Sequence, residues 1–201
     1  MNKADAIVDR PIPRSYWVER GRVLAGEYPG STDDDEARSK IDRLHRAGVT
    51  VFLDLTEEHD TIKLKPYKLF LPTEPSDPEH RVVHRRMSIR DGCAPSIEEM
   101  KAILDEIDSA TSDGHVVYFH CWGGHGRTGT VAGCYLVRHG MPATDALRKI
   151  MRLREGAPNG HYVSPDPGPQ TEMVLNWHRW DTGLGSASGS GVSERECHNS
   201  R

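Results

Sequence analysis

The fold is decided by the stretch HVVYFHCWGGHGRTGTVAGCYLVRHG, residues 115–140. Its first part, HVVYFH, is a short apolar run rich in β-branched and aromatic side chains, which predicts a buried strand. Its last part, residues 128–140, predicts a helix that ends at Gly140. Between them, residues 120–130 contain four glycines, two histidines, one cysteine and one arginine. The stretch therefore predicts a strand, a reactive glycine loop and a helix in direct succession.

Strands and helices alternate on both sides of this unit. The expected strands are 49–55 and 81–89, beside a hairpin at 15–26. The expected helices are 31–48, 95–110, 142–156 and 168–180. Residues 56–79 are expected to be mostly loop. This alternation predicts a single α/β domain whose central, mostly parallel sheet of about four to five strands is flanked by helices. Ligands of such sheets bind at the carboxyl ends of the strands. We therefore expect the functional site at the glycine loop.

Two helix starts carry capping signals. Ser31 or Thr32 can cap the first expected helix, and Ser96 with Glu99 forms a capping box at the second. Such side chains satisfy backbone N–H groups that the first turn of a helix leaves without partners. The signals therefore predict where the preceding loops end.

The composition is that of an ordinary globular protein, with 36% hydrophobic and 28% charged residues. Residues 15–182 are expected to form the folded domain, between a flexible N-terminal segment, 1–14, and a disordered Gly/Ser-rich tail, 183–201. The formal net charge of −4 argues against nucleic acid as a partner. No run of about 20 apolar residues is present, so membrane insertion is not expected. The four cysteines lack disulfide-framework spacing, which favours a reducing, cytoplasmic location.

The backbone of the loop is suited to binding an anion. Gly123, Gly124 and Gly126 let the chain curl so that its N–H groups converge on one point. The free N–H groups and the dipole of the following helix face the same point. Arg127 adds a rigid, two-pronged cation that can bind two oxygens at once. A phosphate group fits this set of donors best.

Cys121 is expected to lie at the base of this cradle as a nucleophile. Donors that hold a phosphate also stabilise a thiolate, and the sulfur then faces the phosphorus atom. Thr128 can donate its hydroxyl to the sulfur, and His120 can brace the loop by hydrogen bonds to backbone carbonyls. The loop lacks the lysine of a nucleotide-binding G-x-x-x-x-G-K-[ST] motif. Only His120 and His125 lie near the cysteine in sequence, so a metal site is not expected.

The run from His120 to Thr128 resembles the H-C-x5-R-[ST] signature of cysteine-dependent protein tyrosine phosphatases. The size of the chain and the order of its elements resemble the compact dual-specificity branch, and the Gly-Gly pair resembles the cyclin-dependent-kinase-associated phosphatases. The resemblance covers roughly residues 16–180. It implies a phosphatase fold and hydrolysis of phosphomonoesters through a cysteinyl-phosphate, without a metal or cofactor. A tight structural turn around a core cysteine is the alternative interpretation.

The resemblance also implies a general acid. Dual-specificity phosphatases carry an aspartate on a loop about thirty residues before the cysteine, and here Asp91 lies 121 − 91 = 30 residues upstream. It follows a predicted strand and precedes Gly92. Asp54, at a strand end, and Asp77, in a proline-rich loop, are the rivals. Gln170 can position the attacking water, as a glutamine does in some family members, or simply decorate the first turn of a helix.

The substrate is less well specified. A shallow site would admit phosphotyrosine, phosphoserine and phosphothreonine, so a phosphorylated protein or a small phosphomonoester is the expected partner. Tensin-type lipid phosphatases have lysines where this chain has Trp122 and His125, which weakens a phosphoinositide or inositol-phosphate interpretation without removing it. His125 is expected at the rim above the phosphate. Two other classes remain open: a non-catalytic phosphate-binding regulator, and sulfur or arsenate chemistry on a similar loop.

Overall fold

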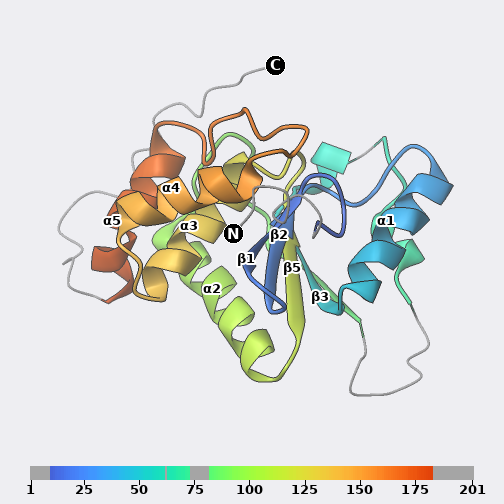
Figure 1. Ribbon diagram of the computed structural model, residues 1–201, viewed down its shortest axis with the longest axis horizontal. Helices are drawn as coiled ribbons and strands as arrows, with labels where there is room; N and C mark the ends of the chain where they lie inside the picture. The colour runs from blue at the N-terminus through green and yellow to red at the C-terminus, as the bar shows by residue number, and fades with distance from the viewer. Residues whose placement is uncertain (1–9, 62, 73–81, 183–201) are drawn as a thin grey trace.

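A five-stranded sheet forms the centre of the molecule (Figure 1). The computed structural model describes residues 10–61, 63–72 and 82–182. Its strands are β1 (Ser15–Glu19), β2 (Val23–Gly26), β3 (Val49–Asp54), β4 (Val83–Arg86) and β5 (Val116–His120), in the order β1-β2-β5-β3-β4. The β1–β2 hairpin is antiparallel, and every other pairing is parallel. The predicted α/β domain with a mostly parallel sheet is confirmed.

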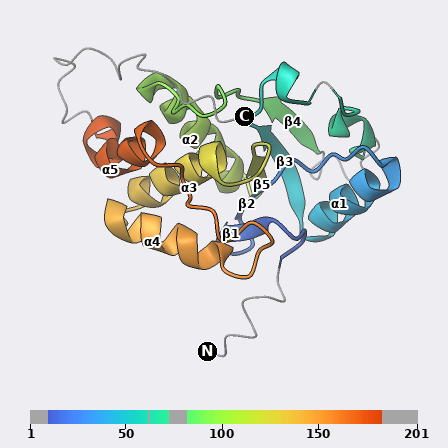
Figure 2. The same ribbon diagram turned by 90° about the horizontal axis from the view of Figure 1, so that it is seen from above.

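Helices cover both faces of the sheet (Figures 1 and 2). One layer contains α2 (Ile97–Ser112), α3 (Gly126–Arg138), α4 (Ala143–Arg154) and α5 (Pro169–Asp181). The opposite face is covered by α1 (Asp34–Arg46), which packs with the short 3-10 helix η2 (Tyr67–Phe70). A second 3-10 helix, η1 (Glu58–Thr61), follows β3. Residues 56–79, expected to be mostly loop, thus contain two short helical turns in their described part.

The core follows the alternation of side chains along the strands. In β5, Val117 and Phe119 pack with the α2–α5 layer, whereas Tyr118 packs on the α1 side. All three side chains are fully buried. A strand covered on both faces is expected to be largely apolar, and Val116–Phe119 is so up to the buried His120 at its end. β5 is therefore the central support of the loop that follows it.

The starts of the helices agree with the sequence at α2 and differ at α1. Ser96 and Glu99 form the predicted capping box, because each side chain accepts from the backbone N–H of the other. At α1 the cap is Asp33, whose carboxylate accepts from two N–H groups of the first turn, and not Ser31 or Thr32. Three consecutive residues could each act as the cap, and the carboxylate also gains from the helix dipole.

The strand predicted over residues 81–89 is limited in the structure to β4, which ends at Arg86. The parallel register brings three strand ends to one edge, because His120 of β5 lies opposite Gly26 of β2 and Asp54 of β3. The glycine loop leaves the sheet at that edge. The glycine loop thus lies at the carboxyl ends of the strands, where the sequence analysis expects the site.

The terminal segments are described only in part. Residues 1–9 of the expected flexible segment and the expected tail, 183–201, lie outside the described residues. Within the described part of that segment, Ile12 is fully buried, and Arg10 donates to the carbonyls of Leu153 and Glu155. Within the described ranges, none of the helices combines the length and the apolar character needed to cross a bilayer.

Candidate active site

The phosphate loop, residues 121–127, joins β5 to α3 and lies tightly against the sheet edge. Gly124 has φ 71°, in the left-handed region, and a Cβ there would lie 2.5 Å from the carbonyl carbon of Gly26. A Cβ at Gly126 would collide with the carboxylate of Asp166. A side chain at position 124 would push the loop away from the backbone of Gly26, whereas at position 126 the half-exposed end of the Asp166 side chain can shift. The glycine at position 124 is therefore required by this close approach.

Cys121 lies at the base of the loop as a free thiol with 3% of its surface exposed. Its backbone N–H donates to the hydroxyl oxygen of Thr128 at 2.9 Å. The same hydroxyl donates to the carbonyl of Gly26 at 3.3 Å. The proton of Thr128 is thus directed at a backbone carbonyl, whereas the sequence analysis directs it at the sulfur. Thr128 fixes the backbone of the cysteine.

Arg127 lies in the first turn of α3 and has 2% of its surface exposed. Its Nη1 donates to Asp60 Oδ2 at 2.6 Å and to the carbonyl of Ile89 at 3.0 Å. Its Nη2 lies 3.0 Å from Asp91 Oδ1. Burial lowers the pKa of Arg127, but the charge of Cys121 and the bond with Asp60 raise it by more. The guanidinium is therefore charged and held in place before any substrate arrives.

Asp91 lies in the acid loop, residues 87–96, which joins β4 to α2. The next residue, Gly92, has φ 71° and turns the chain. The backbone N–H of Asp91 donates to Glu57 Oε2 at 3.4 Å. Its side chain is 73% exposed and paired with Arg127. The structure thus brings the predicted acid to the predicted arginine and leaves it in contact with water.

Asp54, the first rival for the acid, is fully buried at the end of β3. Its Oδ1 accepts from the backbone N–H and the hydroxyl of Thr56. Burial raises the pKa of Asp54, but the bond with His84 and the charge of His120 lower it by more, to well below its ordinary value. A carboxyl group that stays ionised has no proton to donate, so Asp54 braces the turn. Asp77, the second rival, lies outside the described residues.

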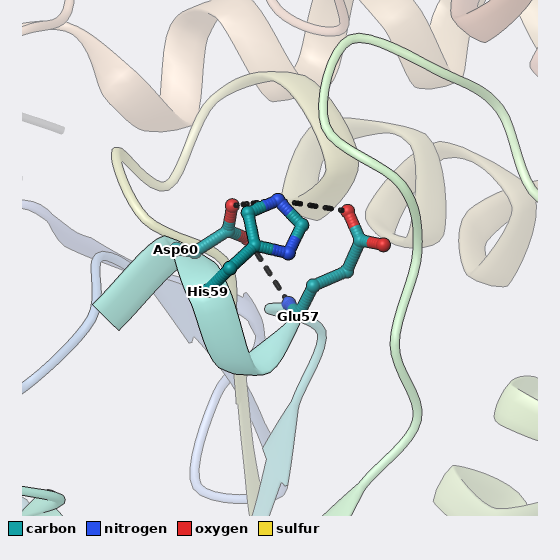
Figure 3. A group of neighbouring side chains, drawn as sticks. All are labelled: Glu57, His59 and Asp60. Carbon is teal, nitrogen blue, oxygen red and sulfur yellow. Dashed lines mark hydrogen bonds and ion pairs between the residues drawn. The ribbon is translucent and has the colours of Figure 1, made fainter. Parts of the chain in front are cut away.

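Three residues that the sequence analysis missed lie beside Arg127. Figure 3 shows Glu57, His59 and Asp60 gathered at η1. Asp60 Oδ2 accepts from the backbone N–H of Glu57 at 3.0 Å, and His59 Nε2 lies 3.7 Å from each of the two carboxylates. Because Asp60 holds Arg127 and Glu57 holds the backbone of Asp91, this group links the phosphate loop to the acid loop. The sequence signal that could have identified these residues is the acidic run shortly after β3, because β3 is a parallel neighbour of β5 and ends at the same edge of the sheet.

Among the described residues, these three side chains form a group of the kind that binds metal ions. Their possible ligand atoms lie within 4.8 Å of one another. One oxygen of each carboxylate is already in use. Asp60 Oδ2 is bound to Arg127, and Glu57 Oε2 accepts from the N–H of Asp91. The group is therefore better described as a polar bridge inside the site than as a place for a cation.

His120 ends β5 and is fully buried beneath the loop. Its Nε2 is hydrogen-bonded to the hydroxyl of Tyr67 at 2.8 Å, a side-chain partner where the sequence favours backbone carbonyls. Burial lowers the pKa of His120 to about 4, against the opposing charge of Asp54. The imidazole is thus neutral near pH 7 and supports the loop from below rather than adding charge to it.

Two aromatic pairs flank the phosphate loop. Trp122 is 49% exposed and stacks on Tyr28, with ring centroids 5.8 Å apart and 25° between the planes. His125 stacks on Tyr162 at 5.4 Å and 25°, and Tyr162 is 53% exposed. The His125 Nε2 also lies 3.7 Å from Asp166 Oδ1. The two loop positions that carry lysine in tensin-type enzymes are thus occupied here by rings that neighbouring aromatic side chains hold in place.

Gln170 lies in the first turn of α5 with 1% of its surface exposed. Its Nε2 donates to the carbonyl of Cys93 at 3.1 Å, and its Oε1 accepts from the backbone N–H of Asp166 at 3.1 Å. The amide therefore joins the acid loop to the turn before α5. Positioning of a water by Gln170 stays a prediction, and would have to share the amide with these two bonds.

Comparison with known proteins shows which family this chain resembles. A family model described as "Swiss Army Knife protein, DSP-PTPase phosphatase domain" matches residues 13–159. The chain is 30% identical over 131 residues to "Phosphatidylglycerophosphate phosphatase PTPMT1" of Arabidopsis thaliana, which is 65% of this chain and 34% of that protein. It is 31% identical over 84 residues to the "Tyrosine-protein phosphatase CDC14 homolog" of Schizosaccharomyces pombe, 40% of this chain and 16% of that protein. The chain thus covers less than half the length of these relatives.

The fold also matches a solved structure. The crystal structure of kinase associated phosphatase superposes with a TM-score of 0.63 over 85% of this chain and 94% of that one, at 17% identity. At this level of identity the likeness concerns the fold alone. It agrees with the single α/β domain described above.

Proposed function

We propose that this chain hydrolyses phosphomonoesters through a phosphocysteine at Cys121. The premise is that the chain belongs to the family of DSP-PTPase phosphatase domains of Swiss Army Knife proteins. The observation that carries the proposal is the ion pair of 3.0 Å between Arg127 and Asp91. It joins the phosphate-binding cation to an exposed carboxyl group from a different loop. A structural turn around a core cysteine has no use for that pair.

The first chemical step forms a sulfur–phosphorus bond and breaks the phosphorus–oxygen bond of the ester. The Cys121 sulfur attacks in line, while the loop N–H groups and Arg127 bind the three remaining oxygens. Asp91 gives its proton to the leaving oxygen. Because an alkoxide is a poor leaving group, such proton transfer contributes about 10²–10⁴-fold to the rate.

The second step hydrolyses the phosphocysteine. Water attacks phosphorus, the sulfur–phosphorus bond breaks, and Asp91 now accepts the proton of the water. When the substrate binds, Arg127 exchanges its contact with Asp91 for the phosphate. The exchange frees the Asp91 carboxyl group for proton transfer in both steps. Its bonds to Asp60 and Ile89 use the other terminal nitrogen, so they can persist throughout.

For the substrate, we favour phosphorylated proteins, with phosphotyrosine, phosphoserine and phosphothreonine all accepted. The aromatic rings of Trp122 and Tyr162 beside the loop support a planar or apolar group next to the phosphate. Tensin-type lipid phosphatases have lysines at two loop positions where this chain has Trp122 and His125. The loop therefore offers no lysine at those positions to bind further phosphate groups.

A phosphorylated lipid head group is the second candidate. It is supported by the relative named as a phosphatidylglycerophosphate phosphatase and by the neighbouring structure "PTPMT1 in complex with PI(5)P", which superposes with a TM-score of 0.63 at 19% identity. The exposed rings at the loop are also compatible with an apolar lipid surface. The two candidates differ in how many charges the substrate presents.

The deciding experiment is phosphate release by the wild type and by Cys121→Ser. We expect the variant to lose turnover and to keep phosphate binding, measured as a shift of the melting temperature with added phosphate, because Arg127 and the loop N–H groups remain. Turnover near the wild-type rate would reject Cys121 as the nucleophile. A wild type that binds phosphate without hydrolysing any ester would instead identify a non-catalytic regulator.

The substrate class is then assigned from kcat/KM on one panel. It contains phosphopeptides of all three residue types, a soluble inositol phosphate and phosphatidylglycerophosphate in detergent micelles. A preference for the peptides supports the first candidate, and a preference for the lipid or the inositol phosphate supports the second.

A further inference from the structure

The buttress segment, residues 155–168 between α4 and α5, is anchored by Arg154, the last residue of α4. The side chain of Arg154 has 1% of its surface exposed. Its Nη1 donates to the carbonyl of Tyr162 at 2.7 Å, and its Nη2 donates to the carbonyl of Asn159 at 2.8 Å. Because a guanidinium presents its donors in a fixed plane, the two bonds set the positions of both carbonyls. Arg154 therefore determines the shape of this segment.

The buttress segment contacts the phosphate loop at three points. Asn159 Nδ2 donates to the carbonyl of Gly123 at 2.6 Å. The ring of Tyr162 stacks on that of His125. The hydroxyl of Ser164 donates to the carbonyl of His125 at 2.7 Å. Two of the three contacts begin at the residues whose carbonyls Arg154 holds, so a displacement of its side chain is transmitted to the loop.

The charge of Arg154 has an unusual setting. Its hydrogen-bond partners are neutral carbonyls, and within the described part of the chain no carboxylate forms an ion pair with it. Burial lowers the pKa of Arg154. A buried cation is costly unless its donors are satisfied. The two carbonyl bonds are therefore the contacts that keep this side chain in place.

We propose that Arg154 is a positioning residue of this site, which holds the buttress segment against the phosphate loop through its two bonds to backbone carbonyls. The inference rests on the proposed function only where the rate of hydrolysis is measured. Alkylation of Cys121 reports on the loop around its sulfur without any substrate, so the two ideas fail separately.

Three variants of α4 separate shape from charge. Arg154→Met removes the fork and the charge, Arg154→Lys keeps a charge without the planar fork, and Arg152→Met is the control, two residues earlier on the same helix and exposed. For each, we would follow alkylation of Cys121 by iodoacetamide across pH, with the modified peptide identified by mass. Steady-state kinetics on p-nitrophenyl phosphate and the melting temperature complete the set.

Arg154→Met is expected to change the alkylation curve of Cys121, because the buttress segment no longer holds the phosphate loop around the sulfur. Its kcat is expected to fall about 10²-fold, because small displacements of a reactive geometry have effects of this size. Arg154→Lys should also lose kcat, since one ammonium cannot hold both carbonyls. Arg152→Met should match the wild type in both measurements.

A folded Arg154→Met protein with the wild-type alkylation curve and the wild-type kcat would overturn the proposal. If that variant does not fold, Arg154→Lys decides: an unchanged kcat rejects the positioning role, and a loss of tenfold or more with KM unchanged supports it. A wild type inactive on every ester would overturn the proposed function, while the alkylation curves of the variants would still test whether Arg154 positions the loop around Cys121.

Discussion

The phosphate loop is held from two sides that differ in burial and in the kind of contact. On the acid side, Arg127 meets Asp60 and Asp91, and the Asp91 side chain is 73% exposed. On the buttress side, Arg154 and Ser164 are almost fully buried and bind neutral backbone carbonyls. A group that exchanges protons with substrate and water has to remain accessible, whereas groups that only define a shape are most effective when packed. The difference suggests that the acid side carries the chemistry and the buttress side carries the geometry.

Asp91→Asn tests the acid side most directly. We expect kcat for alkyl phosphates to fall about 10²–10⁴-fold, because the amide has no proton to give, and to fall less for p-nitrophenyl phosphate, whose leaving group needs none. The basic limb of the pH–rate profile should flatten. Stability should change by less than about 0.5 kcal/mol, since the side chain is exposed.

The matched control is Asp105→Asn. Asp105 is 71% exposed and pairs with Arg138 at 2.7 Å, away from the site, so it repeats the exposure and the arginine contact without the chemistry. Equal rates for both variants on an alkyl phosphate would remove Asp91 from the mechanism and would end the division between the two sides.

The parts of the site that local sequence dictates were predictable. Gly124, Cys121 and Arg127 lie in one short loop whose geometry follows from glycine freedom and a helix start, and the capping box at Ser96 was equally local. Asp91 was selected as the candidate general acid because of the spacing that the family resemblance supplies. Each of these inferences needs only the chain near the residue concerned or a known distance along it.

Asp60, Tyr67 and Arg154 were not predictable in the same way. Asp60 and Tyr67 lie in a stretch without helix or strand periodicity, and their roles arise only because β3 and β5 are parallel neighbours. Arg154 reads in sequence as the last basic residue of a helix, where exposure is the rule. Its burial depends on the path of the segment that follows, which no periodicity specifies.

Asp60→Asn tests whether the acid side also carries part of the geometry. The Asp60 side chain is 11% exposed and accepts from Arg127 at 2.6 Å, so its loss leaves a buried cation with a weaker partner. We expect kcat/KM to fall about tenfold to a hundredfold as Arg127 loses its fixed position. The free energy of unfolding should fall by about 1–3 kcal/mol, measured by urea denaturation.

Asp181→Asn is the control for the stability part of this result. Asp181 is 16% exposed and pairs with Arg138 at 2.6 Å, so it reproduces the pair at a distance from the loop. Both variants should be destabilised, and only Asp60→Asn should lose activity. A loss of stability without any loss of kcat/KM in Asp60→Asn would assign Asp60 to structure alone and narrow the acid side to Asp91.

The smallest expected effect compares one hydroxyl from each side. Ser164 has 2% of its surface exposed and donates to the carbonyl of His125 at 2.7 Å, whereas Ser88 is exposed in the acid loop and donates to the carbonyl of Thr56 at 2.9 Å. Removing either hydroxyl leaves one carbonyl without its donor. Water can replace the donor only where it has access, so Ser164→Ala should cost about 1 kcal/mol of unfolding free energy and Ser88→Ala less than about 0.5 kcal/mol. Both variants should keep kcat within about threefold, because each of the loop's other contacts remains. Urea denaturation and steady-state kinetics on the same preparations check both statements, and a larger loss of stability in Ser88→Ala would contradict the view that burial distinguishes the two sides.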